Sequence, residues 1–169
     1  MSFWELIQED WRANGRDWSK PGFRALFVYR FGVWRMSIRY KILRAPFSLI
    51  YRFLFRRVRN RYSIELPYTV KIGRRLTIEH QGAIVFHGNA RLGNDCIIRQ
   101  GVTLGNRNMN KPFEAPVLGD RVNIGAGAKI LGGIRIGDDA TIGANAVVLK
   151  DVADHMTVVG IPAQPIRTP

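Results

Sequence analysis

The sequence predicts a mainly β protein: a left-handed parallel β-helix of hexapeptide repeats, preceded by an α-helical cap. Aliphatic residues recur every six positions between residues 118 and 148, at Leu118, Ile124, Ile130, Ile136, Ile142 and Val148. Glycine follows four of these six residues, and an apolar, mostly small residue stands four positions after each. A period of six matches neither an α-helix nor strand alternation, but it matches a coil that turns a corner every six residues.

The six-residue spacing extends upstream with two interruptions. It holds at Ile72, Ile78 and Ile84, slips by two residues, and resumes at Phe86, Leu92, Ile98 and Leu104. Fourteen residues separate Leu104 from Leu118, so residues 106–117 are expected to protrude as a loop from one corner. Long insertions on one face of a repeat protein are usually functional, although a tolerated surface insertion is the alternative. We therefore expect a basic helical cap over residues 1–62 and a β-helix over residues 63–169.

The cap is expected to contain three helices. Ser2 and Glu5 form a capping box that predicts the start of the first helix, and Asn14-Gly15 predicts its end. Ser19 and Pro21 are expected to open the second helix, and Pro46 the third. In the third helix the apolar side is expected to carry Phe47, Ile50, Phe53 and Leu54, and the basic side Arg52, Arg56 and Arg59.

The basic charge is concentrated in this cap. Residues 1–62 hold 14 basic and 4 acidic side chains, a net charge of +10, whereas residues 63–169 have a net charge of +3. The third helix either covers the open end of the β-helix with a solvated arginine face outside, or adds peripheral contact with an anionic membrane. Nucleic acid is disfavoured as a partner, because no known binding fold is evident and the charge does not follow a groove of the repeat.

The composition also indicates a compartment. The single cysteine excludes an internal disulfide and suits a reducing cytoplasm. The first residues lack a signal-peptide pattern, and no apolar run reaches the length of a membrane span. We expect a cytoplasmic protein, peripheral at the inner face of the cytoplasmic membrane if the cap binds lipid.

His80 is the principal candidate for chemistry. It stands two positions after an inward aliphatic residue and so at a corner of the coil. Equivalent positions in later coils are Gln100, Ala126 and Ala144, which predicts an edge about 14 Å long with an imidazole at one end. Small side chains expose backbone amides there, which suits a long thin ligand. The alternative is an ordinary surface histidine.

The remaining reactive side chains are expected to have structural roles. His87 falls outside that edge and is expected to be exposed, and His155 lies beyond the last hexad. Cys96 takes an inward small-residue position, so we expect it in the core. The histidine spacing does not resemble the ligand pattern of β-helical carbonic anhydrases, so no metal is expected.

Residues 71–167 resemble serine acetyltransferase and its relatives in the hexapeptide-repeat acyltransferase superfamily, and most of all the polysaccharide-biosynthesis branch, such as the colanic acid acetyltransferases. The stretches that carry the resemblance are Ile78-Glu79-His80, Gly101-Val102-Thr103-Leu104-Gly105-Asn106, Ile124-Gly125-Ala126-Gly127-Ala128-Lys129-Ile130-Leu131-Gly132 and Gly160-Ile161-Pro162-Ala163. The resemblance implies acetyl transfer from acetyl-CoA to a hydroxyl, without a metal. It also implies a homotrimer that binds the thioester between neighbouring β-helices.

The resemblance also implies roles for individual residues. His80 matches the general base, and Glu65 matches the carboxylate that orients it. Glu79 and, more loosely, Asp17 match acids that bind the acceptor. Ala126 and Ala144 fall on the pantetheine side, and Lys150 is the candidate ligand of a CoA phosphate. Because no second histidine is available, we expect backbone amides near Gly105 and Asn106, or the loop of a neighbouring subunit, to hold the oxyanion.

Three departures favour a neutral acceptor. Glu114-Ala115 stands where the family has an arginine and a second histidine, the long C-terminal tail is missing, and the cap is short. A glutamate would repel a serine carboxylate. The expected function is O-acetylation of a sugar hydroxyl in exopolysaccharide, capsule or other envelope glycan biosynthesis, with a glycan or a nucleotide-linked or lipid-linked sugar as the acceptor. The alternatives are a serine acetyltransferase of cysteine biosynthesis and a non-catalytic scaffold or membrane-binding β-helix.

Overall fold

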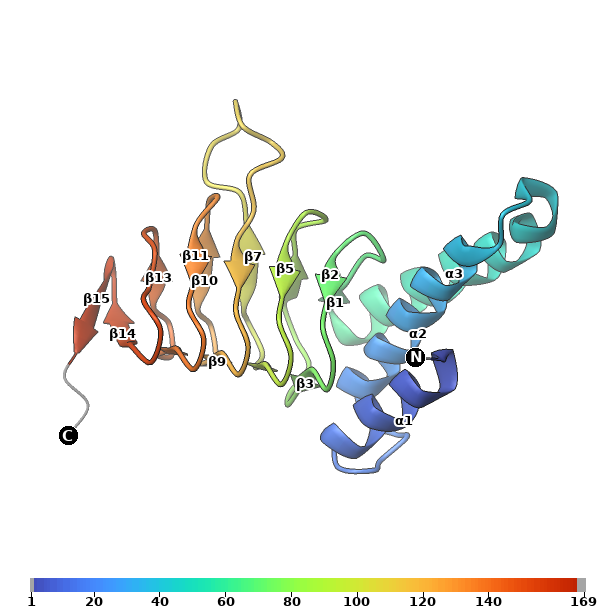
Figure 1. Ribbon diagram of the computed structural model, residues 1–169, viewed down its shortest axis with the longest axis horizontal. Helices are drawn as coiled ribbons and strands as arrows, with labels where there is room; N and C mark the ends of the chain where they lie inside the picture. Colours follow the sequence, from blue (N-terminus) through green and yellow to red (C-terminus); the bar gives the residue numbers. More distant parts are fainter. Residues whose placement is uncertain (1, 167–169) are drawn as a thin grey trace.

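The computed structural model describes residues 2–166 as a helical cap followed by a three-sided parallel β-helix (Figure 1). The cap consists of α1 (Phe3–Ala13), α2 (Pro21–Trp34), the 3-10 helix η1 (Arg35–Ser37) and α3 (Lys41–Tyr62). The predicted fold class is confirmed. Within the described residues, no helix is long and apolar enough to cross a membrane.

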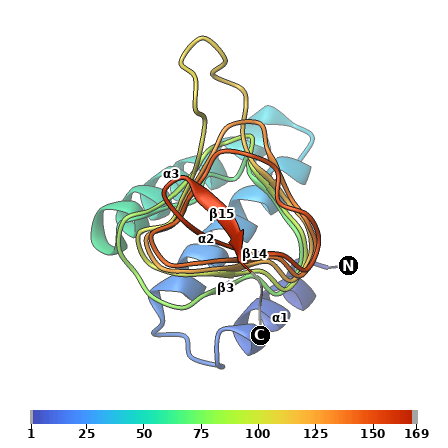
Figure 2. The same cartoon turned by 90° about the vertical axis from the view of Figure 1, so that its left-hand side faces the viewer.

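Three sheets form the sides of the β-helix. Sheet A contains β1 (Ile64–Glu65), β4 (Ile84–Phe86), β7 (Thr103–Gly105), β10 (Lys129–Leu131) and β13 (Val147–Val148); sheet B contains β2 (Lys71–Ile72), β5 (Arg91–Leu92), β8 (Val117–Leu118) and β11 (Arg135–Ile136); sheet C contains β3 (Thr77–Ile78), β6 (Ile97–Ile98), β9 (Asn123–Ile124), β12 (Thr141–Ile142), β14 (Thr157–Gly160) and β15 (Ala163–Ile166). The chain passes from A to B to C and back to A, so each coil has an A/B, a B/C and a C/A corner. Figure 2 shows the three-sided outline, with the loop between β7 and β8 standing out from one corner.

The aliphatic hexad residues fill the interior of the coil. Ile78 pairs with Ile98, and Ile124 pairs with Ile142, and all four side chains are buried. Removing such side chains from water is the dominant favourable contribution to the folding of the coil. The two-residue slip in the pattern leaves the C/A corner before β4 two residues longer than the next one. This enlarged corner contains His80.

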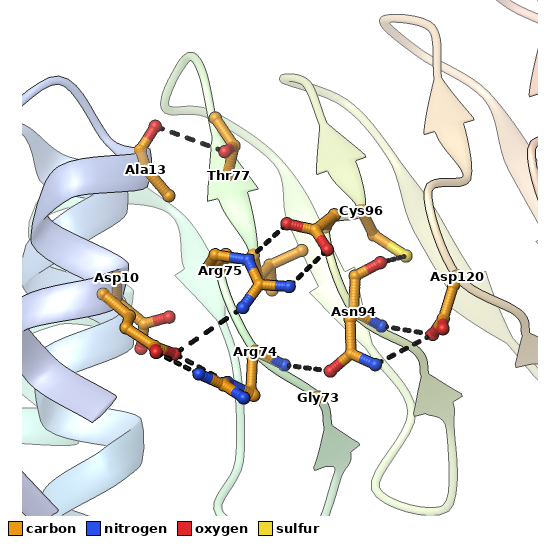
Figure 3. Close-up of polar contacts among 12 residues, drawn as sticks. Asp10, Ala13, Gly73, Arg74, Arg75, Thr77, Asn94, Cys96 and Asp120 are labelled. Carbon is orange, nitrogen blue, oxygen red and sulfur yellow. Dashed lines mark hydrogen bonds and ion pairs between the residues drawn. The ribbon is translucent and has the colours of Figure 1, made fainter. Parts of the chain in front are cut away.

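A ladder of side-chain hydrogen bonds runs down the B/C corner. The backbone N–H groups of Arg74 and Asn94 donate to Asn94 Oδ1 (2.9 Å) and Asp120 Oδ1 (2.6 Å) (Figure 3). Asp138 and Asp154 continue the ladder, with 2.9 Å for each step. The ladder satisfies backbone donors at the corner that no strand can pair, and it keeps successive coils in register.

The cap docks on the first coil through the end of α1. The Asn14 side chain donates to the Leu76 carbonyl (3.0 Å) and accepts from the Ile78 N–H (3.1 Å), so one buried amide pairs with the edge of β3 that faces away from β6. Thr77 Oγ1 donates to the Ala13 carbonyl (Figure 3). These bonds hold the α1–α2 connection beside the C/A corner.

A buried ion pair fixes the helices to each other and to the coil. Arg30 of α2 contacts Asp10 of α1 at 2.8 Å, and its Nη2 also donates to the Gly73 carbonyl (2.6 Å). Burial raises the pKa of Asp10, and the hydrogen bond from Arg30 opposes that rise. Removing either partner would leave an uncompensated buried charge, which is strongly destabilising.

Several expectations for the cap need correction. The Ser2–Glu5 capping box and the end of α1 at Asn14 are confirmed. However, Ser19 does not cap α2, because its backbone N–H and hydroxyl donate to Asp17. Pro46 does not open α3, which begins at Lys41. Pro46 is in the second turn of α3 and has no N–H, so the carbonyl of Ile42 loses its helical partner. Ile42 is largely exposed, so water can bond to this carbonyl.

The expected apolar side of α3 is also partly wrong. Phe47 and Leu54 are half-buried against the cap, as predicted. In contrast, Ile50 and Phe53 are 49% and 64% exposed. The helix has apolar side chains on two sides, and only one side packs on α2.

Candidate functional site

His80 lies beside a hollow of about 340 Å³ at the enlarged C/A corner. The hollow is lined by Ala13, Asn14, Gly15 and Lys20 from the cap and by Thr77, Ile78, Glu79 and His80 from the coil. The His80 side chain is exposed and makes no hydrogen bond to any other described residue. Its imidazole is therefore available to form a hydrogen bond with a ligand held in the hollow.

Arg99 is a site residue that the sequence analysis missed. Its Nε lies 2.6 Å from Glu79 Oε2, and its Nη1 donates to Asn123 Oδ1 (2.6 Å). Arg99 stands twenty residues after Glu79, the length of one coil, so the repeat register itself could have revealed the pair. As a result, the Glu79 charge at the edge of the hollow is balanced by a guanidinium of the same subunit.

In the described part of the chain, neither Glu65 nor Asp17 forms a hydrogen bond or ion pair with His80. Glu65 is on β1 and pairs with Val85 of β4, the strand into which the His80 corner leads. The described residues contain no hydrogen bond between Glu65 and His80. Asp17 is in the α1–α2 connection, where hydrogen bonds from Ser19 lower the pKa of its carboxyl. It is not among the residues that line the hollow.

The predicted small-residue edge has the expected register. At successive C/A corners, Gly127 N donates to the Gln100 carbonyl (2.8 Å), and Asn145 N donates to the Ala126 carbonyl (2.8 Å). Ala126 is half-exposed, and Ala144 is exposed. A ligand that extends from the hollow along this edge would pass the exposed Gln100 side chain and then the backbone and methyl groups of Ala126 and Ala144.

The other candidate residues lie on the opposite edge of sheet A. Gly105 is the last residue of β7 and Asn106 follows it at the A/B corner, and the exposed Lys150 follows β13 at the same corner. A second hollow, of about 640 Å³, lies here between the protruding loop and residues 131–134. Glu114 lines it and forms a 2.8 Å ion pair with Lys111. The candidates are thus divided between the two edges of one sheet.

His87 has a role that the sequence analysis did not predict. We expected an exposed histidine, but its side chain is half-buried and holds the protruding loop. His87 Nε2 donates to the Pro112 carbonyl (2.9 Å), and Nδ1 accepts from Asn89 N (3.2 Å). Asn89 Nδ2 also donates to the Phe113 carbonyl (3.1 Å). The returning limb of the loop is therefore attached to the coil.

Cys96 is in the core, as predicted. Its thiol is fully buried, and Sγ lies 3.3 Å from the Gly119 carbonyl. Burial raises the pKa of this thiol to about 11, so it is a poor nucleophile at neutral pH. Residues 2–166 contain no group of three or more His, Cys, Asp or Glu side chains that could hold a metal ion.

The comparisons with known proteins agree with this geometry. The family described as "Bacterial transferase hexapeptide (six repeats)" matches residues 115–150. The serine acetyltransferase of Helicobacter pylori strain J99 is 39% identical over 165 residues, which is 95% of this chain and 92% of the relative. The serine acetyltransferase of Mycobacterium tuberculosis is 38% identical over 146 residues, which is 86% of this chain and 61% of that protein.

Solved structures give the same result. The serine acetyltransferase of Vibrio cholerae superposes with a TM-score of 0.83 at 29% identity, covering 99% of this chain and 66% of that chain. The serine acetyltransferase of Brucella abortus in complex with coenzyme A superposes with a TM-score of 0.82 at 26% identity, covering 97% of this chain and 67% of that chain.

These relatives are named serine acetyltransferases, so the expected placement in the polysaccharide branch is not supported. The expected chemistry is supported: the chain is an acetyl-CoA-dependent O-acetyltransferase. Because the Helicobacter pylori enzyme is 39% identical over 95% of this chain and 92% of its own length, the chain belongs to the serine acetyltransferase family of the hexapeptide-repeat transferases.

Proposed function

We propose that this protein transfers the acetyl group of acetyl-CoA to the side-chain hydroxyl of L-serine in the hollow beside His80. The names of the relatives support serine as the acceptor. The observation that carries the proposal is the position of His80, an unpaired imidazole between the hollow and the small-residue edge. An acceptor in the hollow and a thioester along the edge would meet at this side chain.

His80 is proposed to act as the general base. A hydroxyl is a weak nucleophile at neutral pH, so its proton has to leave as the oxygen attacks the thioester carbon. His80 accepts that proton, and the resulting imidazolium then protonates the departing thiolate of CoA. Glu65 is proposed to stabilise the imidazolium. The oxyanion would be held by backbone N–H groups, with Gly105 and Asn106 as the candidates.

The cofactor residues support a shared site. Ala126 and Ala144 are proposed to line the pantetheine arm, and Lys150 to bind a CoA phosphate. These residues lie on opposite edges of sheet A. One groove would contain both sets if an edge of one subunit lay against the other edge of a neighbour. This division supports a homotrimer with three sites between subunits.

Lys20 is the proposed anchor for the serine carboxylate. It lines the hollow together with His80, and none of the ion pairs in the described part of the chain involves it. Glu79 is the available partner for the serine ammonium. The hollow thus offers one cation and one anion to a zwitterion.

One observation favours a second candidate, a neutral sugar hydroxyl. The Glu79 carboxylate is bound to Arg99 at 2.6 Å and is less available to an incoming ammonium group. In addition, Glu114 lies in the loop, where a carboxylate would not attract an amino acid's carboxylate. A sugar would require no charge complementarity in the hollow.

A panel of acceptors distinguishes the two candidates. Release of CoA from acetyl-CoA is measured with L-serine, with neutral sugars and with no acceptor. We expect turnover with serine, and Lys20→Gln should raise the KM for serine about tenfold with little change in kcat, because one charge-assisted hydrogen bond is lost. Lys41→Gln, at an exposed lysine of α3, is the matched control.

Two outcomes would overturn the serine proposal. Turnover with sugars but not with serine, unaffected by Lys20→Gln, would establish the second candidate. Release of CoA with no member of the panel, by protein that binds acetyl-CoA, would exclude both acceptors.

A further inference from the structure

The helix α3 has an apolar stripe on the side that faces away from the protein. Its inward side is anchored by Tyr51 and Val58, which are 5% and 8% exposed. On the opposite side, Ile42, Leu49 and Phe53 are 87%, 65% and 64% exposed. Spacings of seven and four residues place these three side chains in one row along the helix. We call this row the outer stripe.

Arginines border the outer stripe on both sides. Helical geometry places Arg52 and Arg56 along one border and Arg57 along the other, and all three are exposed. Residues 35–62 contain nine basic residues and no acidic one. The ion pairs in the described part of the chain involve none of these nine.

The first half of α3 projects away from the β-helix. Figure 1 shows the end of α2, η1 and the start of α3 as the part of the molecule farthest from β15. The tip of this projection is apolar as well, because Met36, Tyr40 and Leu43 are 42%, 68% and 60% exposed. The tip and the outer stripe therefore present exposed apolar side chains, with basic side chains beside them, at the end of the molecule farthest from β15.

The charge of this surface selects its partner. A second copy of the chain would bring the same cationic border against itself, with no carboxylate in residues 35–62 to pair with it. An anionic bilayer supplies both complements, since its acyl boundary accepts Ile, Leu and Phe side chains and its phosphates bind guanidinium groups. We propose that the outer stripe, its arginines and the tip dock the protein peripherally on an anionic membrane surface. This proposal is independent of the acceptor.

Co-sedimentation with lipid vesicles tests the proposal. Binding is expected with equimolar phosphatidylcholine and phosphatidylglycerol, and it should weaken as salt is added and be absent with phosphatidylcholine alone. Arg52→Gln/Arg56→Gln/Arg57→Gln should reduce partitioning about 100-fold, from about fivefold for each arginine. Ile42→Ser/Leu49→Ser/Phe53→Ser should reduce it at least tenfold while all charges are kept.

The matched control removes the same charge elsewhere. Lys71 of β2, Arg91 of β5 and Arg135 of β11 are exposed on sheet B, and their replacement by Gln should leave vesicle binding within about twofold of the wild type. An equal loss in this control would show that net charge alone drives binding and would overturn the proposal. So would an absence of binding by the wild type.

Light scattering of the same variants tests whether a second copy of the chain covers the outer stripe. The serine-substituted outer stripe should leave the oligomeric state unchanged, and turnover on a small soluble acceptor should be retained. Dissociation of the assembly by these substitutions would show that a second copy covers the stripe and would overturn membrane docking.

Discussion

A buried thiol in this protein gives a direct test of core packing. Burial raises the pKa of Cys96 to about 11 from an ordinary value of 9.0. The native protein should therefore react with a disulfide reagent at pH 8 at least a hundredfold more slowly than the urea-unfolded chain. Rapid stoichiometric labelling of the folded protein would contradict the described core.

The same shift has a consequence for stability at alkaline pH. A pKa that is higher in the folded state adds stability below the unfolded value of 9.0, and this stability is lost as the pH rises towards about 11. Cys96→Ala should therefore reduce the fall in the free energy of unfolding between these pH values, measured by urea titration. An unchanged pH dependence would contradict this assignment.

Individual contacts differ in how far the sequence reveals them. The pair of Glu79 and Arg99 follows from the coil length, because residues one coil apart lie side by side. The bond from His87 to the Pro112 carbonyl does not follow from it. The loop lies outside the repeat, and its path depends on tertiary contacts that no local period encodes.

At the scale of the elements, α2 approaches β3 at a glycine. A Cβ on Gly22 would lie 2.2 Å from the Ile78 carbonyl oxygen, so alanine would force the cap away from the coil. Alanine normally stabilises a helix interior by about 1 kcal/mol relative to glycine. Here we expect the clash to dominate, with overpacking costing about 1–3 kcal/mol.

Gly22→Ala should consequently lower the melting temperature by several degrees and reduce turnover, because the hollow beside His80 lies at this contact. Gly133→Ala is the control for calorimetry, since its Cβ would meet nothing closer than 3.4 Å. Equal melting temperatures for both variants would show that the cap can shift without cost.

The elements of the coil were predictable, whereas the orientation of α3 was not. Each strand is marked by an inward aliphatic residue at a fixed period, and the loop is marked by a break in that period. The helix α3 has apolar residues on two sides, so its periodicity does not decide which side packs on α2. The contact at Gly22 and the ion pair of Asp10 with Arg30 decide how the cap docks.

At the scale of the whole molecule, each corner of the coil has a separate task. The B/C corner holds the ladder of side-chain hydrogen bonds, the C/A corner carries His80 and the small-residue edge, and the A/B corner carries the loop and Lys150. This arrangement follows from a repeat in which every third hexad returns to the same edge. It leaves the proposed cofactor residues divided between two edges.

We therefore expect the protein to be a homotrimer in solution. Light scattering at micromolar concentration should give the mass of three chains of 19.2 kDa each. If each site combines His80 of one subunit with Lys150 of its neighbour, some sites in mixed trimers of His80→Ala and Lys150→Ala chains contain both native residues. Such mixed trimers should therefore be more active than either variant alone. A fully active monomer would contradict the shared site.

The central claim is that His80 removes the proton from the acceptor hydroxyl. The most direct measurement is the steady-state release of CoA by His80→Ala, with circular dichroism and light scattering to confirm its fold and assembly. We predict a loss in kcat of roughly two to four orders of magnitude, with little change in acetyl-CoA affinity, and a smaller loss for Glu65→Gln. Near-normal turnover by folded, assembled His80→Ala protein would contradict the account.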